Sequence, residues 1–209
     1  METPNSKEPA EGAVQMDDPG KECMLAFQAG DEAAFERLIG LYSERAYALF
    51  VRFLGRHEGC EDLVQELFLR MWKAGDRYQP SARFTTWMYR IAFNLAANDG
   101  ERRRLRRSQS LSMETAPGQT LGAGILDEAA DEPSLSMERE DVVRQVRGAI
   151  ASLPDTQRMA LILARYEEQS YQDIGDSLSI SAKAVKSLIH RARETLRERL
   201  AHVIAGDLS

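Results

Sequence analysis

Apolar residues recur at helical spacing along most of the chain, and no alternating strand pattern interrupts them. Between 31 and 54 they follow a period of about 3.6 residues, and Gly55 ends the run. A second amphipathic segment opens at 58–62 with acids in its first turn, where the helix dipole favours negative charge. The pattern therefore predicts an all-α protein built from amphipathic helices.

A third helix is predicted over 84–98, and it runs into the cationic tract ERRRLRR at 101–107. This helix is rich in aromatic residues. Rings beside cations suit single-stranded nucleic acid, because unpaired bases stack on the rings while the cations follow the phosphates. Burial in a core would explain the rings as well. We expect burial for Tyr89 and Phe93, and both interpretations stay open for Trp87.

The C-terminal half predicts helices at 137–153 and 155–168, followed by a helix-turn-helix at 171–193. Ser181 is placed to cap the second helix of this motif through its hydroxyl. Five apolar residues can form one seam between the two short helices: Ile174, Leu178, Ile180, Val185 and Ile189. Five polar residues of the last helix lie away from that seam: Lys183, Lys186, Ser187, His190 and Arg191.

A helix with such a polar face can enter the major groove of DNA, where its side chains reach base edges and phosphates. An ordinary helical hairpin with a solvated basic face explains the same pattern. The stretch 171–193 alone does not choose between the two.

Between these halves, residues 108–138 combine glycine, proline, serine, threonine and acids without any period. A structureless span of this length is uncommon inside one compact domain. We therefore expect two small helical domains, at 21–107 and 139–205, joined by a flexible acidic linker. Residues 1–20 contain three prolines and no apolar periodicity, which predicts a disordered tail.

Composition supports a soluble, helix-rich protein, with 43% apolar and 29% charged residues. No stretch approaches the roughly 18 apolar residues of a spanning helix. The N-terminus lacks the basic and then apolar order of a secretory signal, so we expect a cytoplasmic protein without membrane insertion. Cys23 and Cys60 have neither CxxC spacing nor a histidine cluster, so no metal is expected and two reduced thiols are the default. A redox role for them stays an alternative.

The net charge of −6 opposes nucleic-acid binding at first sight. The basic residues, however, concentrate at 102–107 and along the last helix, and such segregation allows local contact with phosphate. His57, His190 and His202 have no nucleophile or carboxylate at motif spacing. We therefore expect no catalytic residue, no cofactor and no enzymatic activity.

Two blocks of sequence carry a family resemblance. The first is CEDLVQELFLRMWK followed by FTTWMYRIAFNLA, and the second is SLPDTQRMALILARYEEQSYQDIGDSLSISAKAVKSLIHRARETL. In this order and spacing they resemble a bacterial RNA polymerase sigma factor of the extracytoplasmic-function group of the sigma-70 family. The resemblance covers residues 21–201 apart from the linker, and it implies a winged-helix-like helix-turn-helix in the C-terminal domain.

The resemblance also implies roles for residues of the N-terminal domain. The DLVQE helix would dock on the clamp coiled coil of core RNA polymerase, through Asp62, Gln65, Glu66 and Phe68. The next helix and the loop at 75–83 would recognise the promoter −10 element and capture a flipped base. Their implied contacts with DNA, which include phosphates at the upstream edge, are Trp87, Arg90, Asn94, Arg102, Arg103 and Arg104.

In the C-terminal domain, the resemblance implies recognition of the −35 element as duplex DNA. Lys186, Ser187, His190 and Arg191 would contact bases or nearby phosphates. Arg158, Tyr171 and Lys183 would lie against the DNA backbone.

Three positions depart from the family pattern. Leu188 stands where many members have an arginine, which removes one cationic contact. Ser179 stands where helix-turn-helix motifs often have glycine, so the turn must tolerate a side chain. Asn98, Asp99 and Gly100 are expected to break up the end of the helix that begins at Phe84.

The resulting hypothesis is a sigma factor that binds core polymerase, reads the −35 and −10 elements and promotes promoter melting. Polymerase would fix the distance between the tethered domains, and an anti-sigma factor would hold the chain inactive. One alternative is a self-sufficient helix-turn-helix regulator that binds a palindromic site as a dimer. Another is a helical adaptor whose basic tracts are only solvated faces.

Overall fold

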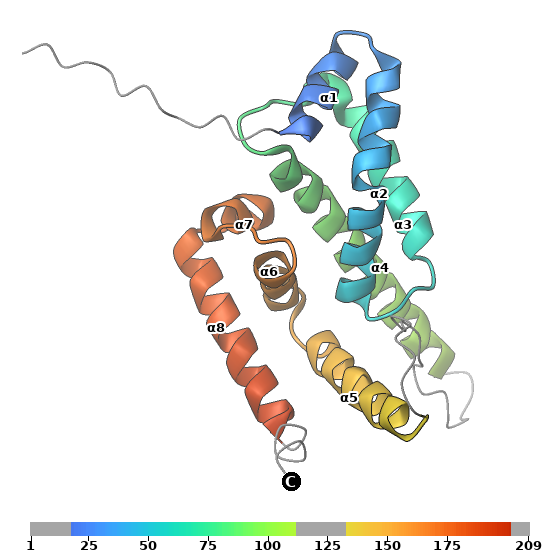
Figure 1. The fold of residues 1–209 in the computed structure, drawn as a ribbon, viewed down its shortest axis with the longest axis vertical. Helices are drawn as coiled ribbons and strands as arrows, with labels where there is room; N and C mark the ends of the chain where they lie inside the picture. The colour runs from blue at the N-terminus through green and yellow to red at the C-terminus, as the bar shows by residue number, and fades with distance from the viewer. Residues whose placement is uncertain (1–17, 112–132, 202–209) are drawn as a thin grey trace, which may run out of the picture.

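The structure, a computed structural model, describes residues 18–111 and 133–201. Within these ranges the chain forms eight α-helices and one short 3-10 turn, and no strand, which confirms the predicted all-α class. The predicted tail lies outside the described residues except for 18–20, and most of the predicted linker, 112–132, lies outside them as well. Figure 1 shows two groups of helices packed side by side.

The N-terminal group contains four α-helices, and local caps explain where they begin and end. Asp18 and Asp31 accept hydrogen bonds from the backbone N–H groups three residues on, at 3.2 and 3.3 Å, and so cap the first two helices. Gly55 adopts φ +68 and ends the second helix in a left-handed conformation. The helices are α1 (Pro19–Gln28), α2 (Glu32–Leu54), α3 (Cys60–Ala74) and α4 (Phe84–Leu111), with the 3-10 turn η1 at Gly75–Arg77.

Large apolar side chains fill the space between these four helices. Phe50, Leu67 and Met88 are fully buried there, and so is Tyr89, as the sequence predicts. Phe93 is half-buried and packs edge-on against Phe53, with 6.1 Å between the ring centroids. Tyr89 and Phe93 of α4 therefore pack within the core of this helix group.

The expected break at 98–100 was wrong, because α4 continues as one helix to Leu111. The Asp99 carboxylate receives Arg56 Nη2 at 2.5 Å and Arg103 Nε at 3.2 Å. Gly100 faces open space. A glycine inside a helix costs only about 1 kcal/mol relative to alanine, so these two ion pairs and the packing of the helix outweigh it.

The C-terminal group contains α5 (Pro133–Ala151), α6 (Asp155–Arg165), α7 (Tyr171–Leu178) and α8 (Ala182–Arg199). α5 begins four residues before the predicted start at Met137. The predicted cap at Ser181 is confirmed, because its hydroxyl accepts from Ala184 N at 3.2 Å. The turn accommodates the side chain of Ser179, whose backbone adopts the left-handed conformation with φ +58.

A small residue is required where α7 meets the turn before α8. A Cβ at Gly175 would lie 2.6 Å from the carbonyl oxygen of Ile180, so only glycine allows this approach. Ile174, Val185 and Ile189 are buried, which places three of the five predicted seam residues in the core of the motif.

The two groups of helices do not lie apart. α6 packs on α2, and α7 packs on α4, so buried residues of both groups join one continuous apolar cluster.

Cys23 and Cys60 are buried free thiols, and burial raises the pKa of Cys60 to about 11. That thiol therefore stays protonated at neutral pH. None of the helices in the described ranges is long and apolar enough to cross a membrane.

Candidate interaction surfaces

One exposed stripe runs along α3. Asp62 and Gln65 are exposed and Glu66 is half-buried, with Glu66 Oε1 held at 2.7 Å by Arg70 Nε. Phe68 is only 5% exposed and packs edge-on against Phe35, so it supports the helix from inside. The predicted docking residues thus divide into three at the surface and one in the core.

Sequence reasoning missed two apolar members of this α3 stripe. Leu69 is 46% exposed and Trp72 is 42% exposed. Leu69 follows Gln65 by four residues and Trp72 follows Leu69 by three, which places all three on one side of the helix. The apolar pattern of this helix places Trp72 on its inward side, whereas the structure leaves it 42% exposed. One part of its ring does contact Phe27, at 4.6 Å between centroids, while the rest stays at the surface.

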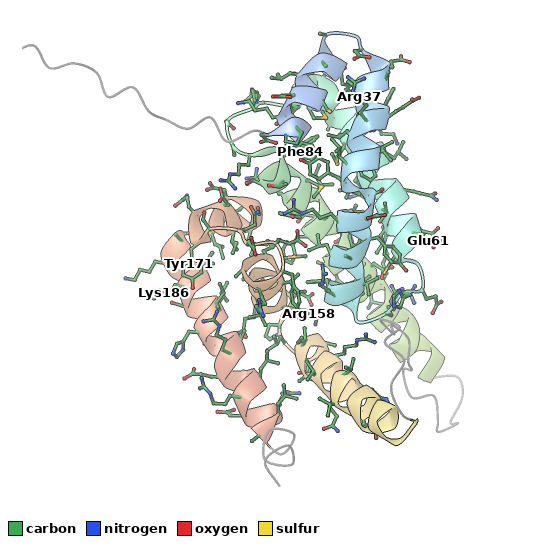
Figure 2. All side chains as sticks on the ribbon, viewed as in Figure 1. Arg37, Glu61, Phe84, Arg158, Tyr171 and Lys186 are labelled. Atoms are coloured by element: carbon green, nitrogen blue, oxygen red, sulfur yellow. The ribbon has the colours of Figure 1, made fainter. Side chains whose placement is uncertain are left out.

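A cavity of about 330 Å³ lies at the N-terminal end of the α3 stripe. Its lining combines two ring side chains that touch each other with three carboxylates, and Figure 2 labels Glu61 among them. The Tyr47 hydroxyl lies 2.8 Å from His57 Nδ1. The full lining is Tyr47, His57, Glu58, Gly59, Glu61 and Asp62. This end of α3 is therefore acidic and hollowed.

A second set of predicted residues lies on one side of α4. Trp87 is half-buried and packs on Tyr78 of the preceding loop, at 4.9 Å between ring centroids. Arg90 and Asn94 are exposed and follow Trp87 at helical spacing. Arg90 is nevertheless engaged, because its Nη2 donates to the Asp176 carbonyl oxygen at 2.5 Å.

The basic end of α4 is described only in part. Arg102 is exposed, and Arg103 is half-buried and tied to Asp99. The side chain of Arg104 lies outside the described part of the structure. Of the three arginines expected to contact phosphates here, the structure thus describes one that is exposed, Arg102, and one that is paired with a carboxylate, Arg103.

The polar face of α8 is open along its first half. Lys183, Lys186, Ser187, His190 and Arg191 are all exposed. Two contacts brace this face within the helix: Arg191 Nε donates to the Ser187 carbonyl oxygen at 3.3 Å, and His190 Nδ1 lies 3.2 Å from Glu194 Oε2. Tyr171, 39% exposed, lies with Lys186 on the outer side of α7 and α8 (Figure 2). Leu188 is half-buried against the core, away from this face.

Arg158 lies apart from the other predicted −35 residues, between the two groups of helices. Its guanidinium donates to the carbonyl oxygens of Phe53 at 2.9 Å, Ala151 at 2.6 Å and Leu153 at 2.8 Å. It also stacks over the Phe53 ring, 4.9 Å from the centroid. Burial lowers the pKa of Arg158, and the nearby Asp155 opposes that shift. In this arrangement the side chain is only 12% exposed.

The same boundary between the helix groups holds a buried carboxylate that the sequence did not predict. Glu167, 3% exposed in its side chain, accepts from Arg45 Nε at 2.5 Å and from the Tyr89 hydroxyl at 2.6 Å. Arg52 Nη1 approaches its other oxygen at 3.5 Å. The two hydrogen-bond donors precede Glu167 by 122 and 78 residues, so no local signal could reveal the cluster.

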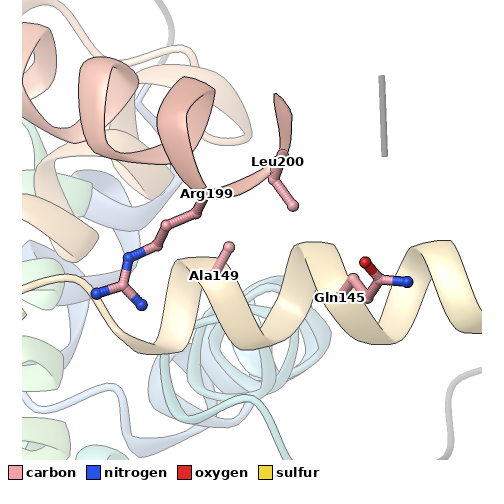
Figure 3. A pocket seen from close by; sticks show the side chains of 4 residues that line it. All are labelled: Gln145, Ala149, Arg199 and Leu200. Carbon is pink, nitrogen blue, oxygen red and sulfur yellow. The ribbon is translucent and has the colours of Figure 1, made fainter. Parts of the chain in front are cut away.

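A further cavity, of about 330 Å³, opens between α5 and α8 and is shown in Figure 3. Gln145 and Ala149 line it from α5, and Arg199 and Leu200 line it from the end of α8. It is separate from the surfaces above.

Comparison with known proteins gives two family matches in one chain. Residues 38–109 match "Sigma-70 region 2", and residues 144–196 match "Sigma-70, region 4". The first match covers α3 and most of α2 and α4. The second covers α6, α7, most of α8 and the C-terminal part of α5.

Several curated proteins align over nearly their whole length. The extracytoplasmic-function sigma factor SigW of Bacillus subtilis is 34% identical over 181 residues, covering 82% of this chain and 91% of that protein. The sigma-H factor of Pseudomonas aeruginosa is 32% identical over 174 residues, covering 83% and 89%. The sigma-E factor of Escherichia coli is 30% identical over 181 residues, covering 85% and 92%.

Two solved structures share the fold. One is the sigma factor RpoE in complex with the anti-sigma factor NepR from Bartonella quintana, with a TM-score of 0.61 and 22% identity over 80% of this chain and 96% of that one. The other is CnrH in complex with the cytosolic domain of CnrY, with a TM-score of 0.61 and 22% identity over 88% and 99%. At this identity the likeness concerns the fold alone.

Proposed function

The chain belongs to the extracytoplasmic-function group of the sigma-70 family, and from that premise we propose that it directs core RNA polymerase to promoters through their −35 and −10 elements. The observation that carries this proposal is the presence of both sigma-70 regions, in order, in a chain that aligns with 91% of a named relative. We divide the chain at 108–138, as expected from sequence, into a second-region domain and a fourth-region domain.

Core polymerase would bind the stripe on α3. Asp62, Gln65 and Glu66 offer carboxylate and amide oxygens at the surface, and Leu69 and Trp72 offer apolar area beside them. A polar rim around exposed aromatic and aliphatic side chains is the usual composition of a protein interface. Phe68 contributes by holding α3 on the core.

Single-stranded DNA of the −10 element would bind the side of α4 that carries Trp87, Arg90 and Asn94. An aromatic ring and a cation on one helix side provide stacking and a phosphate contact. Arg102, Arg103 and Arg104 would follow the backbone at the upstream edge. Capture of unstacked bases would hold the melted strands apart, and the chain itself would make no bond.

Duplex DNA of the −35 element would bind the exposed face of α8. Lys186, Ser187, His190 and Arg191 would reach bases or phosphates in the major groove, and Lys183 and Tyr171 would contact the backbone. Tethering both readers in one chain raises the effective concentration of the second once the first is bound. Because bacterial promoters lie in the cytoplasm, we expect the protein to act there.

An anti-sigma factor is the expected regulatory partner. Support comes from the two solved structures of similar fold, both of which are complexes, one with NepR and one with the cytosolic domain of CnrY.

The deciding experiment is run-off transcription with purified core polymerase and a promoter library. We expect specific initiation only when the chain is present. The double substitution Asp62→Arg with Gln65→Ala should abolish polymerase binding, because it places a cation where the exposed carboxylate stands. Glu36→Arg, a charge reversal at another exposed acid on α2, should leave binding unchanged.

Two outcomes would contradict the proposal. One is binding of a palindromic duplex by a dimer without any polymerase-dependent initiation, which would favour a self-sufficient regulator. The other is equal loss of polymerase binding in the Glu36→Arg variant, which would show that charge in general, rather than the α3 stripe, controls docking.

A further inference from the structure

The exposed loop segment 79–83 lies between two buried residues. Its five residues are at the surface, whereas Tyr78 before it and Phe84 after it are buried. The Trp87 ring lies near both flanking rings, with its centroid 4.9 Å from that of Tyr78 and 6.1 Å from that of Phe84. The contacts that fix the two ends of this segment therefore also fix Trp87, the ring to which we assign single-stranded −10 DNA.

The first end of the segment is tied to the C-terminal end of α1. Gln28 donates from Nε2 to the carbonyl oxygens of Gly75 at 2.8 Å and of Tyr78 at 3.0 Å. The Phe27 ring lies against Gly75, where a Cβ would stand 2.5 Å from the ring. The Tyr78 hydroxyl, in contrast, is buried without a hydrogen-bond partner among the residues that the structure describes. Such burial is unfavourable, so backbone and ring contacts, rather than this hydroxyl, hold Tyr78 in place.

The second end of the segment is tied to the N-terminal end of the same helix. The two carboxylate oxygens of Asp18 serve different helices, because Oδ1 accepts from Lys21 N at 3.2 Å and Oδ2 accepts from Phe84 N at 2.8 Å. The N–H of Phe84 begins α4 and has no partner within that helix. Gly20 of α1 packs against the Phe84 ring, where a Cβ would stand 2.2 Å from the ring. One carboxylate thus fixes the start of α4 relative to α1.

We propose that Asp18 and Gln28 are positioning residues for recognition of the −10 element, and that α1 is a rigid support that holds segment 79–83 and Trp87 in the geometry that receives an unstacked base. α1 has ten residues and is about 15 Å long, and each of its ends is tied to one end of the segment. A loop that is ordered before binding loses less conformational entropy on binding, which raises its affinity for the base. This inference rests on the proposed role of α4 and of the loop before it. It adds two residues from outside both.

Two substitutions separate a positioning role from a structural one. Gln28 is exposed, so Gln28→Ala removes both hydrogen bonds to the loop and should leave the free energy of unfolding nearly unchanged. Asp18→Asn keeps the shape of the side chain but has one acceptor oxygen in place of two. It can therefore still cap one helix, but not α1 and α4 together.

The test measures how much one unstacked base contributes to binding. The full-length chain in complex with core polymerase is titrated by fluorescence anisotropy against a library promoter whose −10 element is already melted. The non-template strand is then given an abasic site at each −10 position in turn. The dissociation constant for the abasic promoter, divided by that for the intact promoter, is the base ratio. At the captured base it should be about ten for the unaltered chain.

In Gln28→Ala and in Asp18→Asn the base ratio should fall to about three or less, because the loss of one or two hydrogen bonds leaves the loop less well ordered for the base. A purely structural defect would weaken binding to the intact and the abasic promoter by the same factor and leave the base ratio unchanged. Glu22→Ala is the matched control, since Glu22 is another exposed polar residue of α1, and it should also leave the base ratio unchanged.

Two results would overturn the inference. One is a base ratio equal to that of the unaltered chain in folded Gln28→Ala and Asp18→Asn variants, with folding verified by urea denaturation. The other is an equal fall of the base ratio in Glu22→Ala. If Asp18→Asn does not fold, Gln28→Ala decides.

Run-off transcription separates this inference from the proposed function. Absence of specific initiation with the unaltered chain would refute the proposed function, and the inference with it. Initiation with a base ratio of one at every position would refute base capture by this loop. Initiation with a high base ratio that is the same in all variants would refute the positioning role of α1 alone.

Discussion

Backbone conformation at single residues shows where this sequence accepts strain. Glu168 and Ser179 adopt φ values of +50 and +58, in the left-handed region that disfavours residues with a Cβ. Both flank α7, so the short helix that touches α4 is bounded by two strained positions. The sequence indicated only one of them, because the helix-turn-helix pattern marks Ser179 and no pattern marks Glu168.

Two glycines inside helices should respond oppositely to alanine. Gly100→Ala should raise the free energy of unfolding by about 0.5–1 kcal/mol, because Gly100 faces open space within α4. Gly175→Ala should lower it by about 1–3 kcal/mol, because the added Cβ meets the Ile180 carbonyl oxygen at 2.6 Å. Urea denaturation measures both. Changes of the same sign would contradict the described packing around one of them.

Among the helices, the 3.6-residue period and the caps made the elements themselves predictable. Ser181 caps α8 as expected, and the seam of the helix-turn-helix is buried at Ile174, Val185 and Ile189. The course of α4 through 98–100 was not predictable. The helix is stabilised at this point by the ion pair between Asp99 and Arg56, which lies 43 residues away in the sequence. A prediction from the local pattern of residues around 98–100 does not include Arg56.

The DNA-binding role that we propose for α8 predicts a change in salt dependence. Lys186→Ala should weaken promoter binding by the polymerase complex and reduce the log–log slope against salt by about one unit, because one phosphate contact is lost. Arg199→Ala, in the last turn of the same helix, should leave the slope unchanged. Filter binding over a series of salt concentrations checks both. Equal slopes for Lys186→Ala and the unaltered chain would remove Lys186 from the phosphate contacts.

The apolar part of the α3 stripe predicts a loss of polymerase affinity without loss of stability. Leu69→Asp should weaken binding of core polymerase by about 1–2 kcal/mol, because it charges the interior of the interface. Leu41→Asp is the control, since Leu41 is 54% exposed on α2, outside the stripe. Titration of labelled chain with polymerase gives both affinities. An equal loss of polymerase affinity in Leu69→Asp and Leu41→Asp would show that the α3 stripe is not the binding surface.

For the whole molecule, the sequence indicated two helical units and their family but not how they pack. Periodicity describes one helix at a time, whereas the contacts between the units join residues such as Arg45 and Glu167 that stand 122 positions apart. The exposed residues proposed as contacts on α3 and α8 could be identified from sequence, because the spacing of residues along a helix determines which of them share a face. The buried position of Arg158 could not, since it depends on contacts with a neighbouring helix.

The separation of α4 and α7 along the chain also has a consequence during synthesis. Asp176 follows Arg90 by 86 residues. At roughly 5–20 residues per second, the ribosome adds Arg90 about 4–17 s before it adds Asp176, in the helix that covers this side of α4. Every newly made copy therefore passes through an interval in which its aromatic and cationic side of α4 is open. Nascent chains close to the chromosome would meet DNA in that state before their own C-terminal domain exists.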